Sequence, residues 1–165
     1  MRMLITIVVN STTDSMGYQW DAEDYERHSS PQQQWAHDVI HTLKLKGNEK
    51  ALDIGCSDGK VTAELAALLP NGSVHGIDNS DTMIDFAHRR FPPVFFPNLQ
   101  FRWGEAMHLT YYREFDLITS FVSLHWIHNH LAVLAGIKRA LKPGGRIVLQ
   151  FGGKGNAALI SAAAN

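Results

Sequence analysis

Cysteine is almost absent from this chain of 165 residues, because Cys56 is the only one. A single cysteine excludes an intramolecular disulfide, so the sequence is compatible with a reducing compartment. Lysine and arginine form no run, and the formal net charge is only −1. This balance argues against the basic surface that nucleic-acid binding requires. We therefore expect a cytoplasmic protein with no nucleic-acid partner.

Long hydrophobic runs are also missing, and no stretch reaches the length of a membrane-spanning helix. The apolar start, residues 1–9, lacks a clear cleavage site and argues against a signal peptide or a membrane partner. Residues 1–15 differ from the remainder, because a β-prone stretch leads into a polar one. They are either a leader, with Met16 as the natural start, or an extra edge strand. Residues 16–165 have the length and composition of one globular domain.

The hydrophobic pattern predicts an alternation of helices and strands. A first helix is expected over residues 31–46, with Ser30 as its N-cap and Gly47 at its end. The predicted strands are 50–54, 73–78, 99–103, 115–120 and 146–151. The predicted helices that follow are 60–69, 81–90, 129–141 and the start of one at 156–164. Such alternation is typical of an α/β fold with a mostly parallel sheet and helices on both faces.

The strongest motif is the segment 51–59, where a predicted strand runs through a turn containing Gly55 and Gly59 into a helix. Glycines allow a sharp turn and a close ligand approach, and the following helix N-terminus attracts anions. Nicotinamide-binding proteins use the same device. Asp53, at the strand end, suits a cationic ligand group. Asp78 ends the next strand, where a carboxylate accepts ribose hydroxyls or acts as the N-cap of the next helix.

Further segments make this pattern specific, namely 76–80, 104–106, 115–118 and the Leu-Lys-Pro-Gly-Gly stretch at 141–145. With them, residues 20–156 resemble the class I S-adenosylmethionine (SAM)-dependent methyltransferases. The resemblance implies a Rossmann-like, doubly wound sheet that apparently lacks the last two of the usual seven strands. Within the class, the chain is most similar to the trans-aconitate and juvenile hormone acid methyltransferases. This closer similarity is carried by 20–22, Tyr25, Gln32 and 123–126.

The resemblance implies SAM as the cofactor, S-adenosylhomocysteine as its product, and a set of cofactor-binding residues. These are Asp53, Gly55, Cys56, Ser57, Gly59, Asp78, Asn79, Met83, Glu105, Ala106, Ser120 and Phe121. The segment around Asp53 would shape the methionine pocket, and Asp78 would hold the ribose. Asn79 and Met83 would flank the adenine, while Glu105 would accept from its amino group. One departure is Ser57, which stands where the usual loop has its middle glycine.

Ser120 and Phe121 would lie near the sulfonium, and the acceptor would be a small molecule with a carboxylate. A carboxylate is already ionised at pH 7, so its methylation needs alignment rather than a general base. The resemblance implies that Gln32 and Trp126 contact this group and that Tyr25 is a further substrate-binding residue. The plainer interpretations are that Trp126 belongs to the core and that Gln32 lies on a solvated helix face.

His125 is a candidate general base if the acceptor is a hydroxyl or an amine. We assign no metal site, because the spacing of His125, His128 and His130 matches no zinc signature. Two other functions stay open: a truncated SAM-binding domain with little turnover, and a nicotinamide-dependent oxidoreductase. With only five core strands, an exposed sheet edge could also pair two copies into a homodimer.

Overall fold

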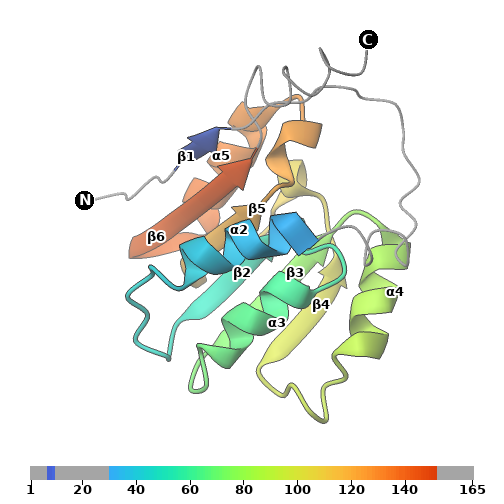
Figure 1. The fold of residues 1–165 in the computed structure, drawn as a ribbon. Helices are drawn as coiled ribbons and strands as arrows, with labels where there is room; N and C mark the ends of the chain where they lie inside the picture. Colours follow the sequence, from blue (N-terminus) through green and yellow to red (C-terminus); the bar gives the residue numbers. More distant parts are fainter. Residues whose placement is uncertain (1–6, 10–29, 152–165) are drawn as a thin grey trace.

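A computed structural model describes residues 7–9 and 30–151, and the side chains from residue 33 onward. Within these ranges it contains the strands β1 (Ile7–Val9), β2 (Lys50–Ile54), β3 (Ser73–Asp78), β4 (Leu99–Trp103), β5 (Phe115–Phe121) and β6 (Leu141–Phe151). They form one sheet in the order β1-β6-β5-β2-β3-β4, with each neighbouring pair parallel (Figure 1). The predicted parallel core of five strands, β2 to β6, is confirmed.

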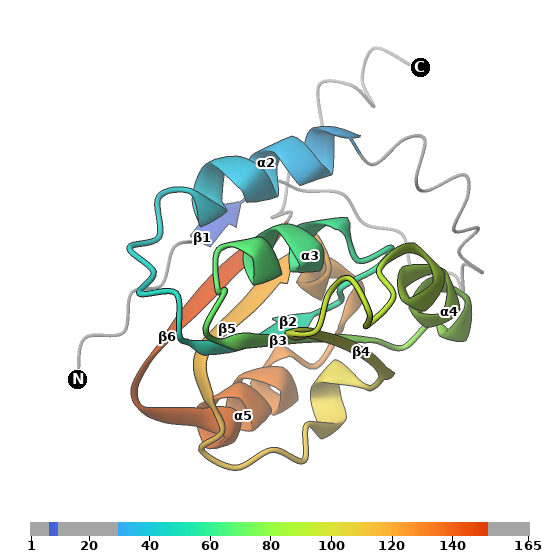
Figure 2. The ribbon, with the colours of Figure 1, turned by 90° about the horizontal axis from the view of Figure 1, so that it is seen from below.

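Helices cover both faces of this sheet. They are α2 (Ser30–Ile40), α3 (Lys60–Ala67), α4 (Asp81–Arg90) and α5 (His130–Ala140), with the 3₁₀ turns η1 (Ala106–His108) and η2 (Leu124–Trp126). Figure 2 shows α2, α3 and α4 on one side of the sheet, and α5 with η1 on the other. The Rossmann-like, doubly wound fold class is therefore confirmed. None of the helices that the structure describes is long and apolar enough to cross a membrane.

Alternation along β2 divides the interior into two cores. Ala51 packs with the residues beneath α2, α3 and α4, whereas Leu52 and Ile54 pack with the residues facing α5. All three are buried. A strand buried on both faces is apolar nearly throughout, and β2 departs from this rule at Asp53. That departure marks the position of the candidate functional site described below.

The first helix ends earlier than the sequence predicts, at Ile40 rather than near residue 46. The last turn tightens, because the N–H groups of Thr42 and Leu43 donate to carbonyls three residues back. Beyond it, the Glu49 carboxylate accepts from the N–H groups of Lys46 and Gly47, at 2.8 and 2.9 Å. The segment between α2 and β2 is therefore held by a side chain rather than by helical hydrogen bonds.

The amino-terminal strand β1 lies against β6, with Ile7 opposite Leu149. These three residues form an edge strand, and the choice between a leader and an extra strand for residues 1–15 as a whole stays a prediction. The rest of that segment and the helix expected at 156–164 lie outside the described residues. Because β1 covers the edge of β6, two copies cannot pair directly through β6. The homodimer stays a prediction.

Candidate functional site

The order of the strands places a crevice between the ends of β2 and β5. From β2 the chain proceeds to β3 and β4 on one side, and then crosses to β5 and β6 on the other. In open α/β sheets, ligands bind at the carboxyl ends of the strands at such a switch point. A pocket lies there, lined by Gln33, Asp53, Gly55, Cys56, Ser57, Asp58, Lys60, Val61, Phe121 and Val122.

The loop between β2 and α3 has the backbone that its glycines were expected to provide. Gly55 and Gly59 have φ angles of 75° and 81°, in the left-handed region that favours glycine. A Cβ on Gly55 would lie 1.9 Å from the Ser123 Oγ, and one on Gly59 would lie 2.6 Å from the Phe101 ring. The loop is therefore pressed against both the end of β5 and the neighbouring β4.

Two residues of the same pocket have a strained backbone conformation. The non-glycine residues with left-handed φ in the described ranges are Ser57 at 52°, Arg113 at 46° and Val122 at 51°. Two of these, Ser57 and Val122, line the pocket. A left-handed conformation costs an L-residue roughly 1–2 kcal/mol, and most for a β-branched one. Such strain persists where function requires a particular backbone course, which supports a ligand site here.

Asp53 forms a buried, charged wall of the pocket. It is 2% exposed, and its two oxygens accept from the hydroxyls of Thr62 at 2.7 Å and Thr119 at 2.9 Å. Burial raises its pKa to about 6, the two hydroxyls oppose that rise, and the nearby Asp78 charge adds to it. A carboxylate in this position is stabilised by any cationic ligand group that enters the pocket.

Asp78 ties the loop to the next strand. Its two oxygens accept from the backbone N–H groups of Ser57 and Ser80, each at 3.0 Å. Burial nevertheless raises its pKa. The N-cap of α4 is Ser80, whose hydroxyl accepts from the Met83 N–H, so the N-cap interpretation of Asp78 is wrong. Each carboxylate oxygen has a second lone pair, which leaves Asp78 able to accept from ligand hydroxyls.

The residues expected around an adenine lie together at the ends of β3 and β4. The Asn79 amide donates to the Glu105 carboxylate at 3.3 Å, and the Trp103 indole N–H donates to the Asn79 carbonyl at 3.0 Å. Met83 is buried beneath the loop, with its sulfur 3.9 Å from the Ser57 hydroxyl. Ala106, also buried, follows Glu105 at the start of η1. Asn79 is thus joined to Glu105, and Met83 to the loop at Ser57, although Asn79, Glu105 and Met83 do not line the pocket itself.

Three predicted cofactor residues differ in how they meet the pocket. Phe121 lines it, and its place near a sulfonium stays a prediction. Ser120 is fully buried, and its hydroxyl donates to the Ile54 carbonyl at 2.7 Å, so it joins β5 to β2. Cys56 lines the pocket wall, but burial raises the pKa of its thiol well above the ordinary range. Its thiolate is therefore disfavoured at neutral pH.

The predicted substrate residues are only partly described. Tyr25 and the side chain of Gln32 lie outside the described residues, but the adjacent Gln33 of α2 lines the pocket. Trp126 is 44% exposed, so it does not belong to the core. Its ring centroid lies 4.9 Å from that of His125. Burial lowers the pKa of His125, which keeps this imidazole neutral at pH 7.

Gln33, which lines the pocket, and the two threonines that hold Asp53 were not predicted from the sequence. Thr119 interrupts an apolar strand that is buried on both faces, and such an interruption is a signal for a polar partner. Thr62 carries no such signal, because its role depends on α3 packing over the end of β2. The sequence resemblance pointed to Gln32 and not to the adjacent Gln33, since helical phase alone does not fix which residue faces a ligand.

Comparison with known proteins gives a consistent match. Residues 45–158 match a family model described as a methyltransferase domain. The trans-aconitate 2-methyltransferase of Deinococcus radiodurans is 30% identical over 131 residues, covering 79% of this chain and 48% of that protein. The demethylmenaquinone methyltransferase of Staphylococcus saprophyticus is 33% identical over 126 residues, covering 75% and 52%. The chain spans about half the length of the curated relatives it matches.

Among solved structures, a SAM-dependent methyltransferase from Aquifex aeolicus superposes with a TM-score of 0.66. The alignment covers 75% of this chain and 69% of that one, at 21% sequence identity. At this level of identity the likeness concerns the fold alone.

Proposed function

The chain belongs to the methyltransferase domain family, and from this membership we propose that it binds SAM and methylates a carboxylate oxygen of a small acid. The observation that carries the cofactor part is Asp53. A buried carboxylate, held by two hydroxyls and facing a pocket at the switch point, fits the ammonium group of a bound amino acid.

The remaining residues fit the rest of that molecule. Asp78 keeps lone pairs for ribose hydroxyls at the end of β3, and Glu105, which follows the next strand β4, accepts from Asn79 and is the candidate for the adenine amino group. Gln33 closes the pocket from α2. Bound SAM supplies an activated methyl group with a neutral thioether as the leaving group. The work of the chain is to orient the two reactants and to exclude water.

A carboxylate acceptor is supported by the chemistry of the acceptor side. The turn η2 begins two residues after the pocket residue Val122, and it carries His125 and Trp126. A neutral imidazole and an indole each donate one hydrogen bond, which orients an anionic acceptor without removing a proton. Alignment of this kind contributes roughly 7–11 kcal/mol in favourable cases. The relative named trans-aconitate 2-methyltransferase also supports this acceptor class.

Two measurements test the proposal in turn. In the first, the protein is titrated calorimetrically with S-adenosylhomocysteine and, separately, with NADH. Binding of the first ligand alone is expected, and binding of NADH alone would establish the oxidoreductase alternative instead.

In the second measurement, SAM is supplied with either trans-aconitate or a hydroxyquinone, and products are analysed by mass spectrometry. A base-labile methyl ester of the acid supports the carboxylate acceptor. Methylation of the quinone alone would overturn that assignment while leaving the cofactor part intact. Cofactor binding with no transfer to either compound would favour the SAM-binding domain with little turnover.

A further inference from the structure

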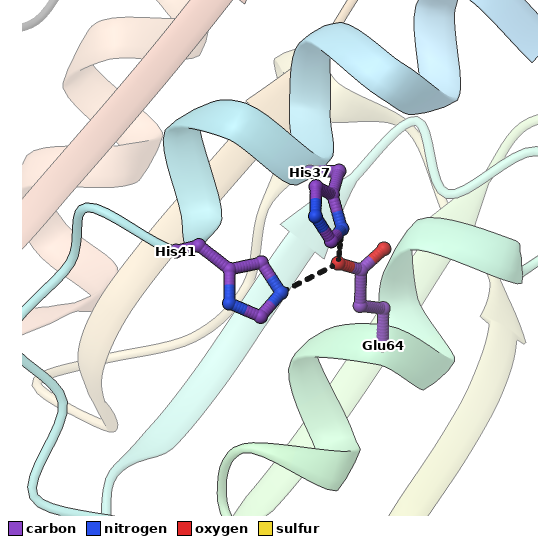
Figure 3. Close-up of side chains that lie close together, drawn as sticks. All are labelled: His37, His41 and Glu64. Carbon is purple, nitrogen blue, oxygen red and sulfur yellow. Dashed lines mark hydrogen bonds and ion pairs between the residues drawn. The ribbon is translucent and has the colours of Figure 1, made fainter.

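Outside the pocket, α2 and α3 bring together two histidines and a glutamate (Figure 3). The Glu64 Oε1 lies 2.5 Å from the His37 Nδ1 and 3.1 Å from the His41 Nε2. The three potential ligand atoms all lie within 4.8 Å of one another. Among the described residues, this is the group of histidine, cysteine and acidic side chains that is close enough to share one ion.

Helical geometry accounts for the pair of histidines. His41 lies one residue beyond the end of α2, but its N–H still donates to the His37 carbonyl at 3.0 Å. The two side chains therefore leave the same helix face one turn apart, with ring centroids 4.2 Å from each other. Histidines four residues apart on a helix are a recurrent zinc-binding arrangement. Glu64 completes the set from α3, which packs beside α2.

The donor set selects a class of metal. Two imidazole nitrogens and one carboxylate oxygen suit zinc and neighbouring transition metals, whereas magnesium and calcium prefer oxygen ligands alone. Ligand atoms at about 2.0–2.2 Å from a tetrahedral zinc lie somewhat over 3 Å apart, so small side-chain rotations suffice here. His37 and His41 are 47% and 49% exposed, which leaves room for a water molecule as the fourth ligand.

We propose that His37, His41 and Glu64 form a binding site for Zn²⁺ or a similar divalent transition metal, which clamps α2 to α3. The clamp has a consequence for the pocket. α2 carries Gln33, which lines the pocket, and α3 carries Thr62, which holds Asp53. A metal at this junction fixes the helix that closes the pocket relative to the helix that supports its charged wall. The site itself stands independently of the methyltransferase assignment.

The test titrates the metal-free full chain with ZnCl₂ by calorimetry and with Co²⁺ by visible absorption. We expect one equivalent of Zn²⁺ to bind, and intense tetrahedral Co²⁺ bands to appear. His41→Ala and Glu64→Gln should each weaken binding by at least about tenfold, since each removes one ligand. His108→Ala is the matched control, because this exposed histidine lies on η1 at the opposite face of the sheet.

Circular dichroism of each variant without metal verifies that its fold is retained. Equal zinc affinity in the wild type, His41→Ala and Glu64→Gln would overturn the proposal, as would the absence of stoichiometric binding. In the latter case the three side chains form a hydrogen-bonded contact only. Binding of S-adenosylhomocysteine by these variants, measured at a saturating concentration, should persist, which separates failure of the metal site from failure of the proposed function.

Discussion

Replacing Asp53 by asparagine should make the protein more stable while abolishing cofactor binding. The pKa of this carboxyl group rises from 3.8 to about 6 in the folded state. That difference corresponds to about 3 kcal/mol, at roughly 1.4 kcal/mol per pKa unit. Asparagine carries no charge to bury, but one threonine hydroxyl must then reverse and accept, at a cost of about 1 kcal/mol. We expect a net gain near 2 kcal/mol.

The sign of the effect fixes its pH dependence. Because the folded-state pKa of Asp53 lies above its unfolded value, the wild type is most stabilised by this group below pH 4 and loses that stability as the pH rises through about 6. The advantage of Asp53→Asn should therefore be small near pH 4.5 and full above pH 7. Thermal unfolding at several pH values measures this difference. Above pH 7, the unfolding midpoint of Asp53→Asn should exceed that of the wild type by about 4–8 °C for a domain of this size.

Asp116→Asn provides the matched control at the other end of the sheet. Burial opposes the charge of Asp116, but hydrogen bonds from Lys142 and from the Lys50 N–H lower its pKa overall. This variant should lose stability at pH 8 rather than gain it. The reasoning about Asp53 is refuted if Asp53→Asn is destabilised at pH 8, if its advantage does not vary with pH, or if it still binds S-adenosylhomocysteine as the wild type does.

The remaining predictions concern the pocket loop. Affinity for S-adenosylhomocysteine should fall about tenfold between pH 7 and pH 5, as Asp53 becomes protonated, whereas a flat calorimetric profile would argue against an ammonium contact. Gly55→Ala should cost at least about 2 kcal/mol in urea unfolding, because its Cβ would collide with Ser123. The control is Gly144→Ala, which has a similar φ but open space and should cost about 1 kcal/mol. Ser57→Gly relieves a left-handed strain and should change stability by less than about 1 kcal/mol while tightening cofactor binding.

The sequence predicts the sheet well because its strands are specified locally. The bounds of β2, β3 and β4 agree with the pattern of apolar residues between glycine, proline and polar turns. The first helix is the exception, because it ends at Ile40 and not near residue 46. Beyond it, the Glu49 carboxylate accepts from the N–H groups of Lys46 and Gly47, three and two residues away. The apolar spacing that predicts the helix contains no information on this side-chain contact.

The candidate site follows the same division. Asp53 and the loop from Gly55 to Gly59 were predicted, since strand, turn and helix are contiguous in the sequence. The zinc-binding candidate was not, although His37 and His41 have a recognisable spacing. Their third partner, Glu64, lies on another helix, and only the packing of α2 beside α3 brings it within 3.1 Å of His41. Ligands that converge from separate helices leave no pattern along the chain.

The two ends of the sheet treat their buried carboxylates in opposite ways. At the amino ends of the strands, burial opposes the charge of Glu49, but the N–H groups of Lys46 and Gly47 and the Arg146 guanidinium prevail and lower its pKa. At the carboxyl ends, burial prevails over hydrogen bonding, and the pKa values of both Asp53 and Asp78 are raised. The second arrangement lowers the stability of the empty fold. A cationic ligand stabilises the ionised carboxylate and so offsets that loss of stability. Raised carboxyl pKa values are characteristic of binding and catalytic sites. The asymmetry therefore favours the carboxyl ends as the ligand site, on electrostatic grounds that are independent of the glycine motif.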